Sequence, residues 1–128
     1  MIYRIRNIEK DDFIALVFEE TVQNLKNAEE ENSIILKEVI NENSHSKGSE
    51  IQEIVLLIQE TWKVISPQVE TVVLGLISAG FWDIMKGAIR KYRSLHEYSS
   101  TKMIEIEQEY IDGHKNKIKI TIEEILDK

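Results

Sequence analysis

The chain has 128 residues, enough for one domain with a sizeable apolar core. It contains no cysteine, which excludes a disulfide framework, a thiolate metal site and a cysteine nucleophile. Its 16 Lys and Arg against 23 Asp and Glu give a formal net charge of −7, which disfavours unspecific binding to nucleic acid. The N-terminal segment is charged from Arg4 onward and lacks the apolar core of a signal peptide, so we expect a cytoplasmic location.

The first thirty residues predict a strand followed by a helix. Residues 2–8, IYRIRNI, are short and rich in β-branched and aromatic side chains, as strands are. Residues 11–28 place apolar side chains along one helical face, with Asp11 or Asp12 as the N-cap. The alternative is a hairpin in which residues 13–18 pair back on the first strand.

The middle of the chain predicts a strand, a loop and a helix. Residues 33–40, SIILKEVI, fit a strand or a short helix, and we favour the strand because a polar loop follows at about residues 42–49. Ser49 and Gln52 then form a capping-box pattern that predicts the start of a helix. Its apolar face would consist of Ile51, Ile54, Val55, Ile58 and Trp62.

The chain's single proline, Pro67, predicts the start of a second helix, with Ser66 as its N-cap. This helix is expected to be the longest, at about residues 67–93. Its segment TVVLGLISAGFW, residues 71–82, carries no charge. Twelve residues span only about 18 Å as a helix, against roughly 30 Å of membrane hydrocarbon, so a simple membrane span is not expected.

Small residues in this helix predict a close neighbour. Each glycine inside a helix costs about 1 kcal/mol relative to alanine, so three of them between positions 75 and 87 require compensation. The neighbour could be another part of the chain, a second copy or a partner protein. The candidate association strip consists of Gly75, Ala79, Gly80, Trp82, Asp83 and Gly87.

Basic residues gather toward the end of the same helix. Cations there complement the negative end of the helix dipole, which already accounts for them. The alternative is contact with anionic lipid or phosphate. This basic collar consists of Lys86, Arg90, Lys91 and Arg93.

The C-terminal part predicts a hairpin with one apolar and one charged face. Isoleucines alternate with glutamates over residues 103–109 and with lysines over residues 117–122. A two-residue turn would set isoleucines opposite charges, so we expect an odd-length loop that contains Gly113, either residues 112–114 or residues 111–115. In either case Ile106 is expected opposite Ile120, Ile104 opposite Ile122, Glu109 opposite Lys117, and Glu107 opposite Lys119. The last six residues, EEILDK, would add a helical turn.

The sequence contains no recognisable catalytic or metal-binding pattern. His45, His96 and His114 fall in separate connections, and none has a carboxylate or second histidine three or four residues away on a helix. The run HEYSS, residues 96–100, is interpreted as a loop, and Asp83 as a residue of the helix surface. We therefore predict no catalytic residues, no metal and no cofactor.

The order of an amphipathic helix, LISAGFWDIMKGAIRKY, and a hairpin of the form IEIE, DG and KIKI resembles the small effector-associated constant component proteins of bacterial conflict and antiviral systems. The resemblance covers about residues 50–122 and rests on unspecific motifs. It implies an accessory or adaptor component rather than a catalyst.

Together these patterns predict a single α+β domain, residues 1–128, in which a small sheet with a C-terminal antiparallel hairpin packs against two or three helices. The predicted function is that of a non-enzymatic interaction or adaptor module, which binds a protein partner or itself through the candidate association strip and the sheet edges. One alternative is an acidic immunity or inhibitor protein, because residues 1–50 carry 6 basic and 11 acidic groups, a net of −5. Another is a membrane-active effector that uses residues 69–89. A nucleic-acid partner is not expected.

Overall fold

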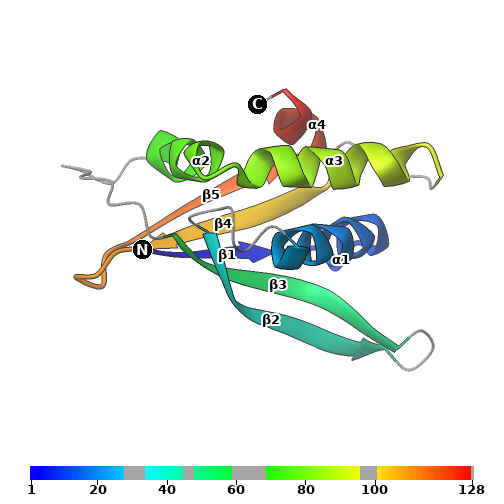
Figure 1. Cartoon of the computed structure of the whole chain (residues 1–128), viewed down its shortest axis with the longest axis horizontal. Helices are drawn as coiled ribbons and strands as arrows, with labels where there is room; N and C mark the ends of the chain where they lie inside the picture. Colours follow the sequence, from blue (N-terminus) through cyan, green and yellow to red (C-terminus); the bar gives the residue numbers. More distant parts are fainter. Residues whose placement is uncertain (28–33, 45–47, 59–68, 96–100, 128) are drawn as a thin grey trace.

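The computed structural model describes residues 1–27, 34–44, 48–58, 69–95 and 101–127. The fold is α+β, with a five-stranded antiparallel sheet in the order β2-β3-β1-β4-β5. The helices lie on one side of the sheet and leave the other side open (Figure 1). In chain order the elements are β1 (Ile2–Arg6), α1 (Asp12–Asn27), β2 (Ile34–Ser44), β3 (Gly48–Ile58), α2 (Val69–Ser78), α3 (Phe81–Arg93), β4 (Met103–Glu109), β5 (Lys115–Thr121) and α4 (Ile122–Leu126).

The first strand and helix are confirmed. Asp11 caps α1, because its side-chain Oδ1 accepts a hydrogen bond from the Ile14 amide at 3.0 Å. Asn7 fixes the turn before the helix by bonding both the amide and the carbonyl of Asp11. The alternative hairpin over residues 13–18 is wrong, because β1 pairs with β3 and β4 instead.

The strand predicted at residues 33–40 is confirmed as β2, but the helix predicted from Ser49 is wrong. Residues 48–58 form β3, a central strand between β1 and β2. Ile54 and Leu56 are fully buried, and Val55, which lies between them in the sequence, is also buried. An apolar run that is buried on both faces fits a strand and a helix equally well by periodicity. Trp62 and the predicted cap at Ser66 and Pro67 lie outside the described residues.

The polar loop predicted at 42–49 is shorter than expected. Residues 42–44 pair with residues 48–50 as a continuation of the two strands. The connection is thereby reduced to residues 45–47, which lie outside the described residues.

The long helix predicted at 67–93 is divided into α2 and α3, whose axes differ by 84°. Gly80 makes the bend, since its φ of 81° is a left-handed conformation that glycine adopts without steric cost. The Gly80 amide donates to the carbonyl of Ile77 at 3.0 Å and so closes the last turn of α2.

The C-terminal hairpin is confirmed with its odd loop and its two faces, but its register differs by two residues. The loop is Ile111–Gly113, closed by the Tyr110 amide on the His114 carbonyl at 2.8 Å. Three-residue hairpin loops place a left-handed residue last, and Gly113, with φ of 89°, occupies that position. The expected loop 112–114 would have put His114 there instead.

This shift preserves both faces, because side chains alternate with a period of two. Ile106 pairs with Ile118 and Ile104 with Ile120, while on the charged face Glu107 pairs with Lys117 and Glu105 with Lys119. Ile122 does not extend the strand. It begins α4, the predicted final turn, behind a capping box made by Thr121 and Glu124.

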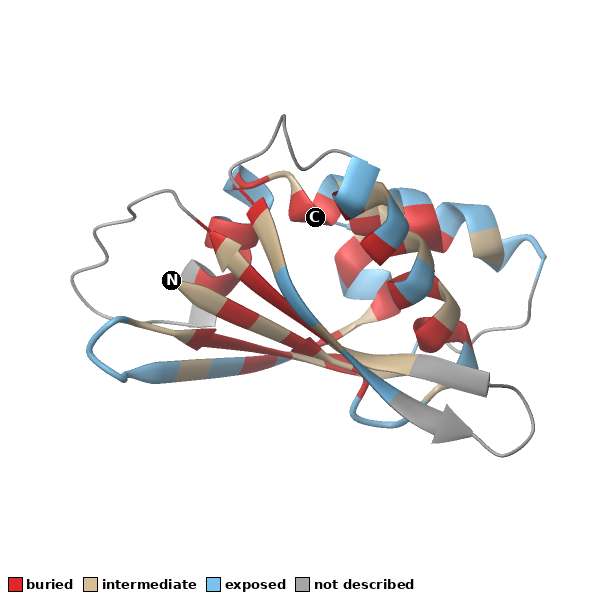
Figure 2. Ribbon diagram, turned by 60° about the horizontal axis from the view of Figure 1, so that its bottom comes forward, coloured by how far each residue is buried: buried red, intermediate tan, exposed pale blue. Residues whose placement is uncertain are grey.

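The core lies between the sheet and the helices. Figure 2 shows buried residues along the helix-covered side of the strands and on the inner sides of the helices. Its largest fully buried side chains include Trp82, Tyr3, Phe18 and Phe81. One face of the sheet is therefore committed to internal packing, and the edges and the opposite face carry the accessible groups.

Candidate functional site

The candidate association strip lies mostly inside the core. Gly75 in α2 is buried against β1, and a Cβ atom at this position would overlap the hydroxyl of Tyr3. That hydroxyl accepts a hydrogen bond from Gln108 Nε2 at 2.9 Å, and burial raises the pKa of Tyr3. The close neighbour that the glycines predicted is thus an internal tyrosine.

The other members of the strip do not form one surface with Gly75. Ala79 and Trp82 are buried, and Trp82 Nε1 donates to the Val73 carbonyl at 3.1 Å. Asp83 and Gly87 are exposed on α3, and a Cβ at position 87 would meet no atom within 4 Å. These six residues therefore do not form one continuous surface, because the bend at Gly80 turns the two halves of the strip in different directions.

Asp83 itself is a helix-surface residue, as predicted. In the described part of the chain it forms no ion pair with Lys86, three residues further along α3.

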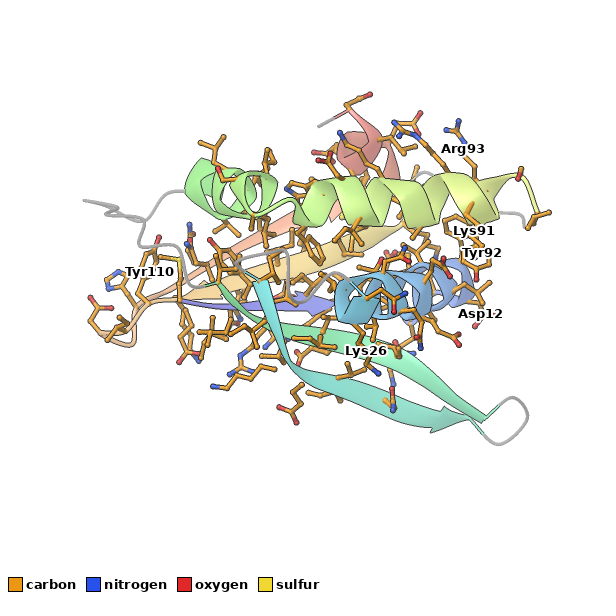
Figure 3. The ribbon with its side chains drawn as sticks, in the orientation of Figure 1. Asp12, Lys26, Lys91, Tyr92, Arg93 and Tyr110 are labelled. Atoms are coloured by element: carbon orange, nitrogen blue, oxygen red, sulfur yellow. The ribbon has the colours of Figure 1, made fainter. Side chains whose placement is uncertain are left out.

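The side chains of the basic collar lie on different sides of α3. Lys91 reaches α1, where its Nζ lies 3.0 Å from Glu20 Oε1, and this bond raises the pKa of Lys91. Arg93 lies on the opposite side of the helix, away from α1 (Figure 3). Arg90 is exposed and Lys86 is partly exposed. Arg90, Lys91 and Arg93 lie in the last turn of α3, where cations complement the helix dipole, whereas Lys86 lies near the middle of the helix.

The open face of the sheet carries a ladder of charges that alternates in sign from strand to strand. β1 contributes arginines, β4 glutamates and β5 lysines, all on the face away from the helices. We call this set the charge ladder. Its members are Arg4, Arg6, Glu105, Glu107, Glu109, Lys115, Lys117 and Lys119.

Glu107 is the centre of the charge ladder. Its side chain is only 4% exposed, and its carboxylate lies 3.0 Å from Arg6 Nη1 and 3.4 Å from Lys117 Nζ. Burial alone would raise the pKa of Glu107, but Arg6 and Lys117 outweigh it and hold the pKa below the ordinary value. Arg6 also bonds Glu53 on β3, so the inner charges of the open face are mutually compensated.

The outer edge of β5 is different, because none of the described strands pairs with its backbone groups. Two backbone hydrogen bonds show which residues of β5 bond β4. The Tyr110 amide donates to the His114 carbonyl, and the Ile122 amide donates to the Lys102 carbonyl, so the even-numbered residues of β5 bond β4. In an antiparallel ladder the residues between them point their N–H and C=O groups the other way. These are Lys115, Lys117 and Lys119, and β5 is the last strand of the sheet on this side.

The opposite edge of the sheet, β2, is interrupted. Its pairing with β3 shifts between Leu36 and Glu38 and again between Ile40 and Asn41. Bulges of this kind twist an edge and break the regular spacing that a further strand would need. Among the strands described, β5 is therefore the edge with unbroken spacing.

Metal and membrane sites find no support in the described residues. No cluster of three or more potential metal ligands occurs among them, and His114 is exposed in the hairpin loop. His45, His96 and the run at 96–100 lie outside the described residues. No described helix by itself has the length and apolarity to cross a bilayer, although α2 and α3 together meet that composition test as a bent pair.

Comparison with known proteins identified no matching family model, no matching curated protein and no matching solved structure. The β5 edge was not singled out by sequence reasoning. Alternating lysines over residues 115–119 are the signal that was present, since lysines are common on the edge strands of sheets.

Proposed function

We propose that this protein is a non-enzymatic interaction module that binds a partner strand along the outer edge of β5. The observation that carries the proposal is the row of outward backbone groups at Lys115, Lys117 and Lys119, on a strand without a bulge. An extended segment added to such an edge gains main-chain hydrogen bonds, and alternate side chains provide specificity. The resemblance of the sequence to conflict-system constant components would imply an accessory or adaptor role for such a module.

The proposal favours a different protein over a second copy as the partner. If two β5 strands paired with each other, lysines would face lysines on the open side of the joint sheet, and like charges directly opposite are destabilising. Homo-oligomers through this edge are therefore disfavoured.

Selection from a library of displayed random peptides tests this function. Lys117→Pro removes an outward N–H and places a ring where the partner backbone would lie, without removing a bond to β4. Lys117→Thr is the matched control, because it loses the same charge and keeps the amide. We expect peptides selected on the wild-type protein to bind the threonine variant and to lose the proline variant. Peptides that bind all three proteins equally would show that β5 is not the binding edge.

A further inference from the structure

The charge ladder specifies which kind of strand the β5 edge accepts. Across the open face the sign changes at each step, from Arg4 and Arg6 on β1 to the glutamates of β4 and then to the lysines of β5. The glutamates of β4 thus have oppositely charged side chains on both neighbouring strands. The next strand outward would continue this order if its side chains were acidic.

The lysines of β5 are only partly compensated. Lys117 lies 3.4 Å from Glu107 and 3.8 Å from Glu105, and Lys115 lies 3.9 Å from Glu107, a carboxylate that also pairs with Arg6. Lys119 forms no ion pair within the described residues, although Glu105 lies opposite it on β4. The side chains of Lys115 and Lys117 are 54% and 56% exposed, so the outer side of this lysine column remains available for further pairing.

We infer that the partner of β5 is an extended acidic segment of another protein, with carboxylates at alternate positions facing the lysines. Neighbouring strands lie about 4.8 Å apart, and residues directly opposite each other have Cβ atoms about 5 Å apart. Glutamate or aspartate can therefore reach the ammonium groups of Lys115, Lys117 and Lys119 from the outer side. This inference rests on the proposed function and adds the chemistry of the partner to it.

A titration with synthetic peptides followed by NMR tests the inference. The first probe is a capped heptapeptide with glutamate at positions 2, 4 and 6 and threonine elsewhere, and the second has glutamine in place of glutamate. We expect the acidic peptide to bind about tenfold more tightly at low salt, since three opposite-charge cross-strand pairs are gained. Its shift changes should centre on the amides of β5, and added salt should weaken it.

Two variants sharpen this test. Lys119→Gln should weaken the acidic peptide about twofold and leave the glutamine peptide unchanged, because this side chain has no ion pair within the described residues to lose and a neutral amide does not repel Glu105 opposite it. Lys117→Pro should abolish the binding of both peptides.

The outcomes separate the inference from the function on which it rests. Equal affinity of both peptides, with both lost on Lys117→Pro, would overturn the acidic partner and keep the β5 edge. Shift changes centred on residues 86–93, or acidic-peptide binding retained by Lys117→Pro, would place binding on the basic collar or elsewhere and overturn both.

Discussion

At Gly75 in α2 and at Lys117 in β5 another group can lie close to the backbone. The two positions differ in where that group comes from. At Gly75 the neighbour is the Tyr3 side chain of the same chain. At Lys117 the outward N–H and C=O have no strand beside them in the sheet. A small residue indicates only that another group lies close to the backbone. Whether that group belongs to the same chain is shown by which backbone N–H and C=O groups are already hydrogen-bonded within the protein.

Proline substitution at two adjacent positions of β5 should give the largest difference in the free energy of unfolding. Asn116→Pro removes an amide that bonds β4, and we expect it to lower the free energy of unfolding by about 3 kcal/mol or more. Lys117→Pro removes an outward amide and should cost about 1 kcal/mol. Urea denaturation of both variants measures the difference, and equal losses would mean that both amides are bonded within the protein.

Replacing each of two glycines by alanine tests whether Gly75 is packed against its internal neighbour. Gly75→Ala should lower the free energy of unfolding by about 2–3 kcal/mol, because the new methyl group overlaps the buried Tyr3 hydroxyl. Gly87→Ala is the matched control in α3, where the space is open, and should stabilise the protein by about 0.5–1 kcal/mol. Neither change should affect peptide binding at β5. A destabilising Gly87→Ala would show that this position is also packed.

The charge ladder makes a prediction about pH. The folded-state pKa of Glu107 lies below its ordinary value of 4.5, so its contribution to stability is present above about pH 4.5 and is lost as the pH falls through the lower folded value. Glu107→Gln should cost about 1–2 kcal/mol at neutral pH and flatten the stability profile below pH 4.5.

Glu109→Gln is the control for this prediction. Its side chain is 27% exposed and has a single arginine partner at 3.4 Å, so the loss should stay within about 0.5 kcal/mol. Thermal unfolding between pH 3 and 7 measures both variants. Identical profiles for the wild type and Glu107→Gln would contradict the central place of this carboxylate.

The parts of the fold that were predicted correctly depend on local patterns. The first strand and helix follow from β-branched content and from the cap at Asp11, and the faces of the C-terminal hairpin follow from alternation. The same alternation predicted the odd length of the loop, because a two-residue turn would set isoleucines opposite charges. The register was displaced by two residues because either register keeps isoleucines on one face, and only the left-handed position of Gly113 distinguishes them.

The parts of the fold that were not predicted depend on contacts between segments far apart in the sequence. Local sequence patterns do not indicate these contacts. Residues 51–58 fit a helix or a central strand until their position between β1 and β2 is known. The sequence could not place the residues of the candidate association strip for the same reason, since only the bend at Gly80 and the position of Tyr3 show where these residues lie. That β5 forms an edge follows from the strand order, which the sequence does not reveal.

Amide hydrogen exchange of the free protein, read residue by residue by NMR, tests the central claim most directly. The account predicts fast exchange at Lys115, Lys117 and Lys119 and slow exchange at Asn116, Ile118 and Ile120, an alternation along one strand. Uniformly slow exchange along β5 would mean that its outer edge is already covered, and would contradict the proposed binding edge.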